Sequence, residues 1–323
     1  MNELLIHTDD EKKVILELTD ILVKNIDGGV ESPAYKYIHE RTLSAIADGR
    51  ITRDALGFSP VVTDMQTAVL VGNEIGFQNE IITSILLNRC VNAGSASIDE
   101  IKDIYGESVT KILTNLMQIN SLYAKSPTIE SENFRNLLLS FTNDMRVILI
   151  MIASRLVMLR GLFDSDNDEA RRLVANEASK LYIPLAHKLG FYKLKSEMED
   201  LALRYTETEI YAELSRKLEE TAASREDYIA SFIKPIEKQL KMQPHIKFRI
   251  KGRTKSINSI WQKMKKQQCS FEQIYDLFAI RIIIDSEPQN EKSECWQVYS
   301  IVADMYTPNP HRLRDWLSVP KSN

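Results

Sequence analysis

The chain has 323 residues, of which 44% are hydrophobic, so it is long enough for two domains that each bury a core. Its 41 lysines and arginines against 45 aspartates and glutamates give a formal net charge of -4, which does not indicate a polyanionic partner. The three cysteines lie far apart, without the spacing of a zinc site or a disulfide framework. With no signal-peptide pattern and no apolar run of spanning length, we expect a cytoplasmic protein without a membrane partner.

The first two thirds of the sequence are predicted to be helical. From residue 10 to about 240 the apolar residues recur at helical spacing. Turn-forming residues divide this region into a bundle of short and medium helices, with breaks expected at 57–60, 72–76, 92–97, 126–127 and 164–168. We therefore expect an all-helical domain over residues 1–190 and a second domain over 191–323.

The period of the apolar residues changes after residue 240. In IKFRIKGR, 246–253, they alternate with lysine and arginine, which predicts a strand with one buried face. The nearly continuous apolar run at 277–285 predicts a central, buried strand. Amphipathic helices are expected at 254–266 and at about 293–305. The fold class is thus predicted as α+β, an all-α domain followed by a mixed α/β domain.

The sequence ends on SVPKSN with no closing helix or strand. Two strands are barely enough sheet to cover their helices, so we expect the second domain to be incomplete at its C-terminus.

The second domain contains a strongly basic segment. Eight lysines and arginines, and no aspartate or glutamate, fall between residues 247 and 271. This local asymmetry favours an anionic ligand, although a solvated strand and helix face would explain it as well. Nucleic acid is a weaker alternative, because few aromatic residues are interleaved with the cations.

The stretch GRTKS, 252–256, sharpens the case for a phosphate ligand. A glycine at the strand end is followed by Arg253 and by Lys255, which is expected on the first turn of a helix. Free N–H groups and the positive dipole end favour a phosphate there. Lys263, two turns further on, is expected on the same helix face as Lys255.

Two charges interrupt the second apolar strand. In YDLFAIR, 275–281, Asp276 enters an otherwise apolar strand and Arg281 lies inside it. A buried charge is costly unless it is paired, so an Asp–Arg pair is one explanation. A carboxylate beside a basic phosphate cradle is instead typical of a magnesium ligand. Strict alternation would separate the two side chains, so both can serve one site only if the strand starts after Asp276.

Two further stretches remain. In HRLRDWLSVPK, 311–321, Arg312, Arg314 and Lys321 form a second basic cluster, which by itself would be an ordinary surface loop. In ITSILLNRCVNAG, 82–94, an apolar helix becomes polar at Asn88 and Arg89, and no histidine or aspartate occurs from 79 to 98.

Several long segments resemble one known family. The segments YIPLAHKLGFYKLKSEMEDLALRY, GRTKSINSIWQKMKK, IYDLFAIRIIID and HRLRDWLSVPKSN are similar to the (p)ppGpp synthetase region of the RelA/SpoT family. The segment ENFRNLLLSFTNDMRVILIMIASRLVMLRGL resembles the hydrolase region of that family. The resemblance extends from about residue 30 to 323. It implies a GTP pyrophosphokinase of the stringent response, which moves the β,γ-pyrophosphate of ATP onto the 3′-hydroxyl of GDP or GTP.

The resemblance assigns roles residue by residue. It implies that Asp276 carries Mg²⁺ and acts in catalysis with Lys255 and Lys263, and that Arg253 and Arg281 flank the adenine of ATP. The complete expected ATP site is Gly252, Arg253, Lys255, Ser259, Lys263 and Arg281. The expected site for the acceptor GDP or GTP is Arg314, where the family often has lysine, with Lys321 and Asn323.

The sequence departs from the family pattern after P-K-x-N. The family continues with G-Y-x-S-L-H-T, whose tyrosine stacks on the acceptor guanine, and later supplies a glutamate proposed to activate the 3′-hydroxyl. Neither is in this sequence, so we expect this chain to have little or no synthetase turnover. It could instead be a nucleotide-binding regulatory module in which the hydrolase-like domain restrains the synthetase. Ribosome contact, which depends on C-terminal domains in the family, is not expected.

The hydrolase motif is degenerate. The family holds Mn²⁺ with a histidine, a His-Asp pair and a distant aspartate, and a Glu-Asp pair helps to activate water. The family's L-L-H-D-V-V-E-D-T becomes LLNRCVNAG here. The six matching positions are Asp64, Asn88, Arg89, Asn92, Ala93 and Ser154. Because Arg89 would repel a cation, we expect no Mn²⁺ and an inactive hydrolase domain.

Overall fold

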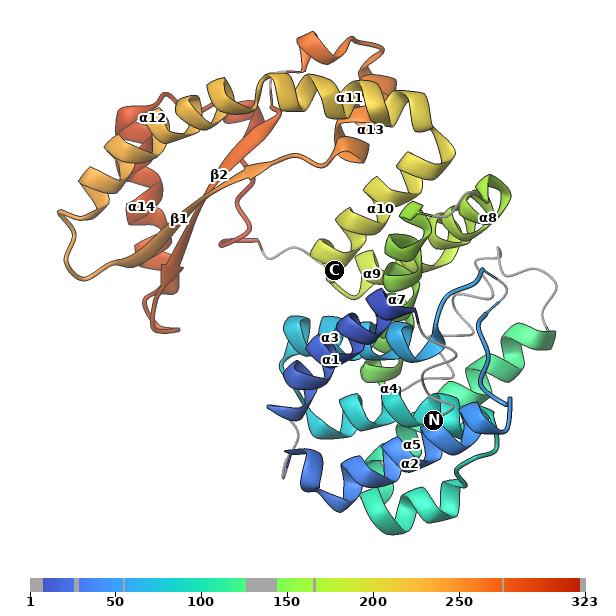
Figure 1. The fold of residues 1–323 in the computed structure, drawn as a ribbon. Coiled ribbons are helices and arrows are strands. Elements are labelled where there is room, and N and C mark those ends of the chain that lie inside the picture. Colours follow the sequence, from blue (N-terminus) through green and yellow to red (C-terminus); the bar gives the residue numbers. More distant parts are fainter. Residues whose placement is uncertain are drawn as a thin grey trace. The chain divides into compact units, whose positions relative to one another are not determined.

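The computed structural model describes residues 8–25, 29–54, 56–125, 144–164, 167–274 and 276–319. The chain divides into two compact units, Met1–Thr206 and Glu207–Asn323, and each is described by itself (Figure 1). Among the described residues, no helix has both the length and the apolar character needed to cross a bilayer.

The described part of the first unit is built from helices. Their bounds are α1 Asp9–Val23, α2 Pro33–Ala47, α3 Pro60–Ile75, α4 Asn79–Asn92, α5 Ile98–Lys125, α7 Met145–Gly161, α8 Asp168–Glu177, α9 Ile183–Lys188 and α10 Tyr192–Thr206. Hydroxyl side chains cap the N-termini of several of these helices. At α3, the Ser59 hydroxyl accepts a hydrogen bond from the backbone N–H of Val62, and Pro60 occupies the first turn. Within α5, Gly106 has φ 80° and breaks the helical geometry.

The main core of the first unit lies around α3, α4, α7 and α10. Buried side chains from these helices include Val71, Ile82, Leu156 and Met198, which belong to one hydrophobic cluster. Because the buried side of α10 joins this cluster, the compact unit extends to Thr206. The division between the compact units therefore differs from the boundary that we expected near residue 190.

The second unit contains helices and one antiparallel pair of strands. Its elements are α11 Thr208–Glu220, α12 Ala222–Leu240, β1 Lys247–Thr254, α13 Ile257–Gln267, the 3₁₀ turn η5 Phe271–Gln273, β2 Phe278–Asp285, α14 Glu291–Met305 and the 3₁₀ turn η6 Pro310–Arg312. The strand–helix–strand–helix order agrees with the sequence. The predicted α+β fold class is confirmed.

The strands β1 and β2 lie side by side and are antiparallel (Figure 1). Their two faces carry different side chains. One face carries apolar side chains, including Ile250 and Ile282, which pack in a cluster with residues of α12 and α14. The opposite face is exposed and cationic, because residues two apart share a face and paired residues face the same way. We call this surface the basic face, and it comprises Lys247, Arg249, Lys251, Arg253 and Arg281.

The prediction that the second strand is central and buried is wrong. In the described part of the chain, β2 pairs only with β1. Its first side chains alternate in exposure: Phe278 and Ile280 are half-buried, whereas Ala279 and Arg281 are exposed. The apolar run 277–285 hid this alternation, because Ile283 is apolar and lies on the same side as the exposed residues.

Gly252 lies on the apolar face of β1, opposite Arg253. A Cβ atom at this position would come within 2.9 Å of Cγ2 of Ile229 on α12. The glycine is therefore needed for the close approach of helix and strand.

Candidate functional site

The residues predicted to handle phosphates and metal form a cluster in the second unit. Asp276 lies between η5 and β2, and the Lys255 ammonium is 2.7 Å from its Oδ2. The Lys263 ammonium, which comes from α13, contacts Oδ1 of the same carboxylate. The three side chains are 40%, 30% and 20% exposed, respectively, so solvent and small ligands can reach them.

The backbone around Lys255 determines how it reaches Asp276. Its own N–H donates to the carbonyl oxygen of Leu277 at 2.8 Å, which holds the end of β1 beside the start of β2. The Ser256 hydroxyl caps α13 by accepting from the N–H of Ser259. Lys255 thus precedes the helix, and the prediction that it lies on the first turn is wrong. The strand β2 begins at Phe278, after Asp276. The condition under which Asp276 and Arg281 could serve one site is therefore met.

The other predicted ATP residues occupy two different places. Arg253 and Arg281 both lie on the exposed basic face. The Ser259 hydroxyl accepts a hydrogen bond from the Ser256 hydroxyl at 2.8 Å, so it takes part in the start of α13. Gly252 lies on the opposite face of β1, where its contact with α12 gives it a packing role.

An ion pair that the sequence did not reveal supports the loop before Asp276. The Lys217 ammonium of α11 is 2.7 Å from Oε1 of Glu272 in η5. The hydrogen bond from Lys217 is the largest of several that lower the pKa of Glu272 to about 2. In the same place, Phe271 packs with Leu214 and Ile260. No sequence pattern could link Lys217 to Glu272, because they lie on separate elements.

The predicted acceptor site is described only in part. Arg314 is exposed, and its Nη1 donates to the carbonyl oxygen of Leu313. The neighbouring Asp315 accepts from the backbone N–H groups of Leu317 and Ser318, so its carboxylate shapes the turn. Lys321 and Asn323 lie outside the described residues.

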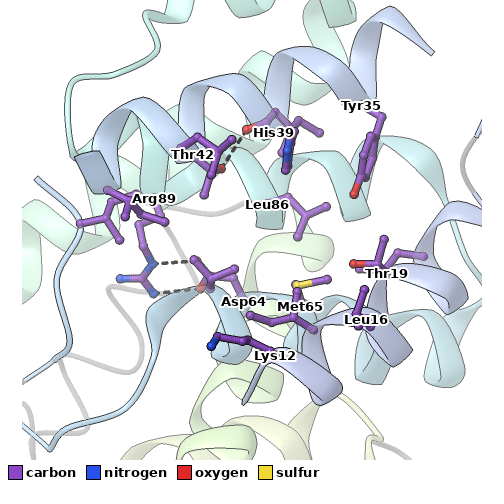
Figure 2. A pocket seen from close by; sticks show the side chains of 17 residues that line it. Lys12, Leu16, Thr19, Tyr35, His39, Thr42, Asp64, Met65, Leu86 and Arg89 are labelled. Atoms are coloured by element: carbon purple, nitrogen blue, oxygen red, sulfur yellow. Dashed lines mark hydrogen bonds and ion pairs between the residues drawn. The ribbon is translucent and has the colours of Figure 1, made fainter. Parts of the chain in front are cut away.

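In the first unit, two of the degenerate hydrolase positions form a bidentate ion pair. Arg89 of α4 donates from Nε and Nη2 to the two carboxylate oxygens of Asp64 on α3, at 2.7 and 2.9 Å (Figure 2). The side chains of Asp64 and Arg89 are 19% and 38% exposed. Burial raises the pKa of the Asp64 carboxyl, although the two hydrogen bonds from Arg89 favour its ionised form.

The remaining degenerate positions carry no metal-binding set. Asn92 donates to Oδ1 of Asn88 one turn earlier, at 3.3 Å, and Ala93 is the C-cap of α4. Ser154 lies on α7. Across the residues that the structure describes, no three histidine, cysteine, aspartate or glutamate side chains come together as a metal site would require.

Comparisons with known proteins identify both halves of the chain. The HD domain family matches residues 48–192, and a family described as a region found in RelA / SpoT proteins matches residues 252–323. The chain belongs to the RelA/SpoT family. The two matches fall on opposite sides of the division between the compact units.

Individual RelA/SpoT relatives carry names of both activities. The chain is 32% identical over 251 residues to a guanosine-3′,5′-bis(diphosphate) 3′-pyrophosphohydrolase of Aquifex aeolicus, covering 77% of this chain and 35% of the relative. It is 32% identical over 249 residues to a GTP pyrophosphokinase of Photobacterium angustum, covering 75% and 32%. It is 28% identical over 265 residues to the bifunctional (p)ppGpp synthase/hydrolase SpoT of Escherichia coli, covering 82% and 37%. The chain thus spans about a third of these relatives' length.

The Asp64–Arg89 pair gives a stability prediction. We expect Arg89→Gln to lower the free energy of unfolding by about 1–2 kcal/mol, because Asp64 is left without its partner in a largely buried position. The value is below that of a fully buried pair because solvent screens Arg89. The double variant Asp64→Asn, Arg89→Gln should lose less than the sum of the single variants, as measured by denaturant unfolding. Lys36→Gln, which breaks an exposed pair with Glu31, is the control and should change little.

The Lys217–Glu272 pair predicts a titration. We expect Lys217→Met to raise the pKa of Glu272 toward the ordinary glutamate range, as followed by carboxyl carbon NMR. The rise should be incomplete, because hydrogen bonds from the backbone N–H of Glu272 and from Ser270 remain. Lys241→Met, which removes an ion pair with Glu237 on α12, should leave this titration unchanged. An unaltered pKa in Lys217→Met would show that Lys217 does not hold η5.

Proposed function

We propose that this protein is a GTP pyrophosphokinase that transfers pyrophosphate from ATP to the 3′-hydroxyl of GDP or GTP, and that its hydrolase-like domain is inactive. The observation that carries the synthetase part is the cluster in which Lys255 and Lys263 both contact Asp276. The relative of Photobacterium angustum named GTP pyrophosphokinase supports the same reaction class.

The two lysines would bind the phosphates of ATP. Each ammonium is held by a carboxylate oxygen of Asp276. Ammonium groups on flexible stems can turn to a triphosphate, which carries more negative charge than one carboxylate. Their positive charge would then stabilise the charge that spreads over the transferred phosphates.

Asp276 fits the role of a Mg²⁺ ligand. It already attracts two cations, and Mg²⁺ is commonly held by one or two carboxylates together with substrate phosphates and water. The bound ion would neutralise charge on the polyphosphate. Asp276 would thus be free to take this role once the lysines have turned to the phosphates.

The basic face supplies the place for the nucleotide base. Arg253 and Arg281 are exposed on the same face of the sheet, and planar guanidinium groups stack on aromatic rings. We assign the adenine of ATP to these two arginines. For the acceptor GDP or GTP, Arg314 is an exposed cation that can contact a phosphate.

The positive charge of Arg89 is the reason for proposing that the hydrolase-like domain is inactive. A guanidinium at the position of a metal-ligand aspartate repels Mn²⁺, and its two hydrogen bonds also occupy both oxygens of Asp64. A carboxylate held in this way is a poor ligand.

The synthetase proposal predicts the behaviour of four variants. With ATP, GDP and Mg²⁺, in the longest form of the protein that its gene encodes, Lys255→Met, Lys263→Met and Asp276→Ala should each lower ppGpp formation by about 10²-fold or more. Lys266→Met, on an exposed position of α13, should retain activity. Product is measured by chromatography, and full activity of Asp276→Ala would remove this residue from the site.

ATP binding, measured beside ppGpp formation, separates an enzyme from a regulatory module. Calorimetry on this chain should detect ATP binding that Arg253→Ala weakens. ATP binding without ppGpp formation in every form of the protein would favour a regulatory nucleotide-binding module.

The hydrolase proposal predicts a negative result with a positive control. Incubation with ppGpp and Mn²⁺ should release no pyrophosphate above the level without protein. The bifunctional relative from Escherichia coli, assayed in parallel, should release it. Release by this chain would overturn the role assigned to Arg89.

A further inference from the structure

The first unit contains a cavity that the proposed reaction does not use. It has a volume of about 490 Å³, which lies in the range of small-molecule sites, and its lining comes from α1, α2, α3 and α4 together with Ile51. All lining residues lie between Lys12 and Arg89.

Most of the cavity lining is apolar. Ile15, Ile38, Met65 and Leu86 are among the aliphatic side chains that face it. Leu16 also lines the cavity and is 69% exposed, so part of the apolar lining is open to water. Water covers such a surface poorly, and an apolar group that fills it would be stabilised.

The charged residues of the lining gather at one end. In Figure 2, Arg89, Asp64 and Lys12 lie on one side of the cavity, and Tyr35, Thr19 and Leu16 lie on the other. A molecule that matches this lining would combine a polar end with a long apolar body.

Among the lining residues at that end, two side chains are cationic and one is anionic. Arg89 uses Nε and Nη2 to neutralise Asp64, so the N–H groups of Nη1 take no part in this ion pair. Lys12 adds a second cation, whose partner Asp9 is 91% exposed and thus strongly screened. Two cations against the single lining carboxylate favour an anion, but they are too few to compensate a nucleotide with two pyrophosphate groups.

We propose that this cavity binds a monoanionic amphiphile, an organic acid with a long aliphatic body. The carboxylate lies near Arg89 and Lys12, and the body lies along the aliphatic side chains of α1, α3 and α4. The site is independent of the proposed synthetase reaction, because none of its residues belongs to the second unit.

Decanoate is a suitable probe, and the full chain is the material. Calorimetry should show saturable binding of decanoate at one site. Decanol, which has the same body without the charge, should bind about tenfold more weakly, and decyltrimethylammonium should not compete. Methyl NMR signals of Ile15, Met65 and Leu86 should shift on decanoate addition.

Two neighbouring lysines of α1 provide a matched pair of variants. Lys12 lines the cavity, whereas Lys13 does not and is 75% exposed. We expect Lys12→Met to weaken decanoate binding by about threefold to tenfold and Lys13→Met to leave it unchanged. Thr19→Trp, which places a large ring in the cavity, should abolish binding while circular dichroism shows a folded protein.

The opposite results would overturn the proposal. These are equal affinity for decanoate, decanol and decyltrimethylammonium, equal effects of the two lysine variants, or displacement of decanoate by ppGpp. Should Thr19→Trp fail to fold, the comparison of Lys12→Met with Lys13→Met and the methyl shifts still decide the question.

Discussion

A carboxylate that is partly withdrawn from water needs a nearby positive charge, and the two units of this chain meet that need in different ways. Asp64 is held by the planar guanidinium of Arg89 through two hydrogen bonds. Asp276 is held by the flexible ammonium groups of Lys255 and Lys263. The first arrangement fixes both partners in one bidentate geometry, whereas flexible ammonium groups can turn to another anion. The proposed loss of hydrolysis and the proposed synthesis both follow from this difference.

The fold could be predicted largely from periodicity. Helical spacing and the change to alternation after residue 240 identified the elements and the α+β class, because burial of one side of each element imposes these periods. The exposure of β2 was missed because Ala279 and Ile283, which are apolar, share the exposed face with Arg281. The boundary between the compact units also differed, because α10 has an apolar side whose partner cannot be read from its own sequence.

The candidate site was predictable where charge stands out against its surroundings. Asp276, Lys255 and Lys263 were named from the sequence, and the structure brings them together. The contact of Lys217 with Glu272 and the packing of Gly252 against Ile229 depend on the meeting of distant elements, so no local pattern could indicate them. The apolar cavity was missed for the same reason, because helices of an ordinary amphipathic pattern line it.

The close approach at Gly252 packs α12 directly on the strand that carries Arg253. The Ile229 side chain packs on the backbone of β1 at Gly252, with no strand side chain between them. Arg253 is the next residue along the strand and points to the opposite face. A displacement of α12 would therefore act on the β1 backbone next to Arg253, whose side chain lies on the basic face.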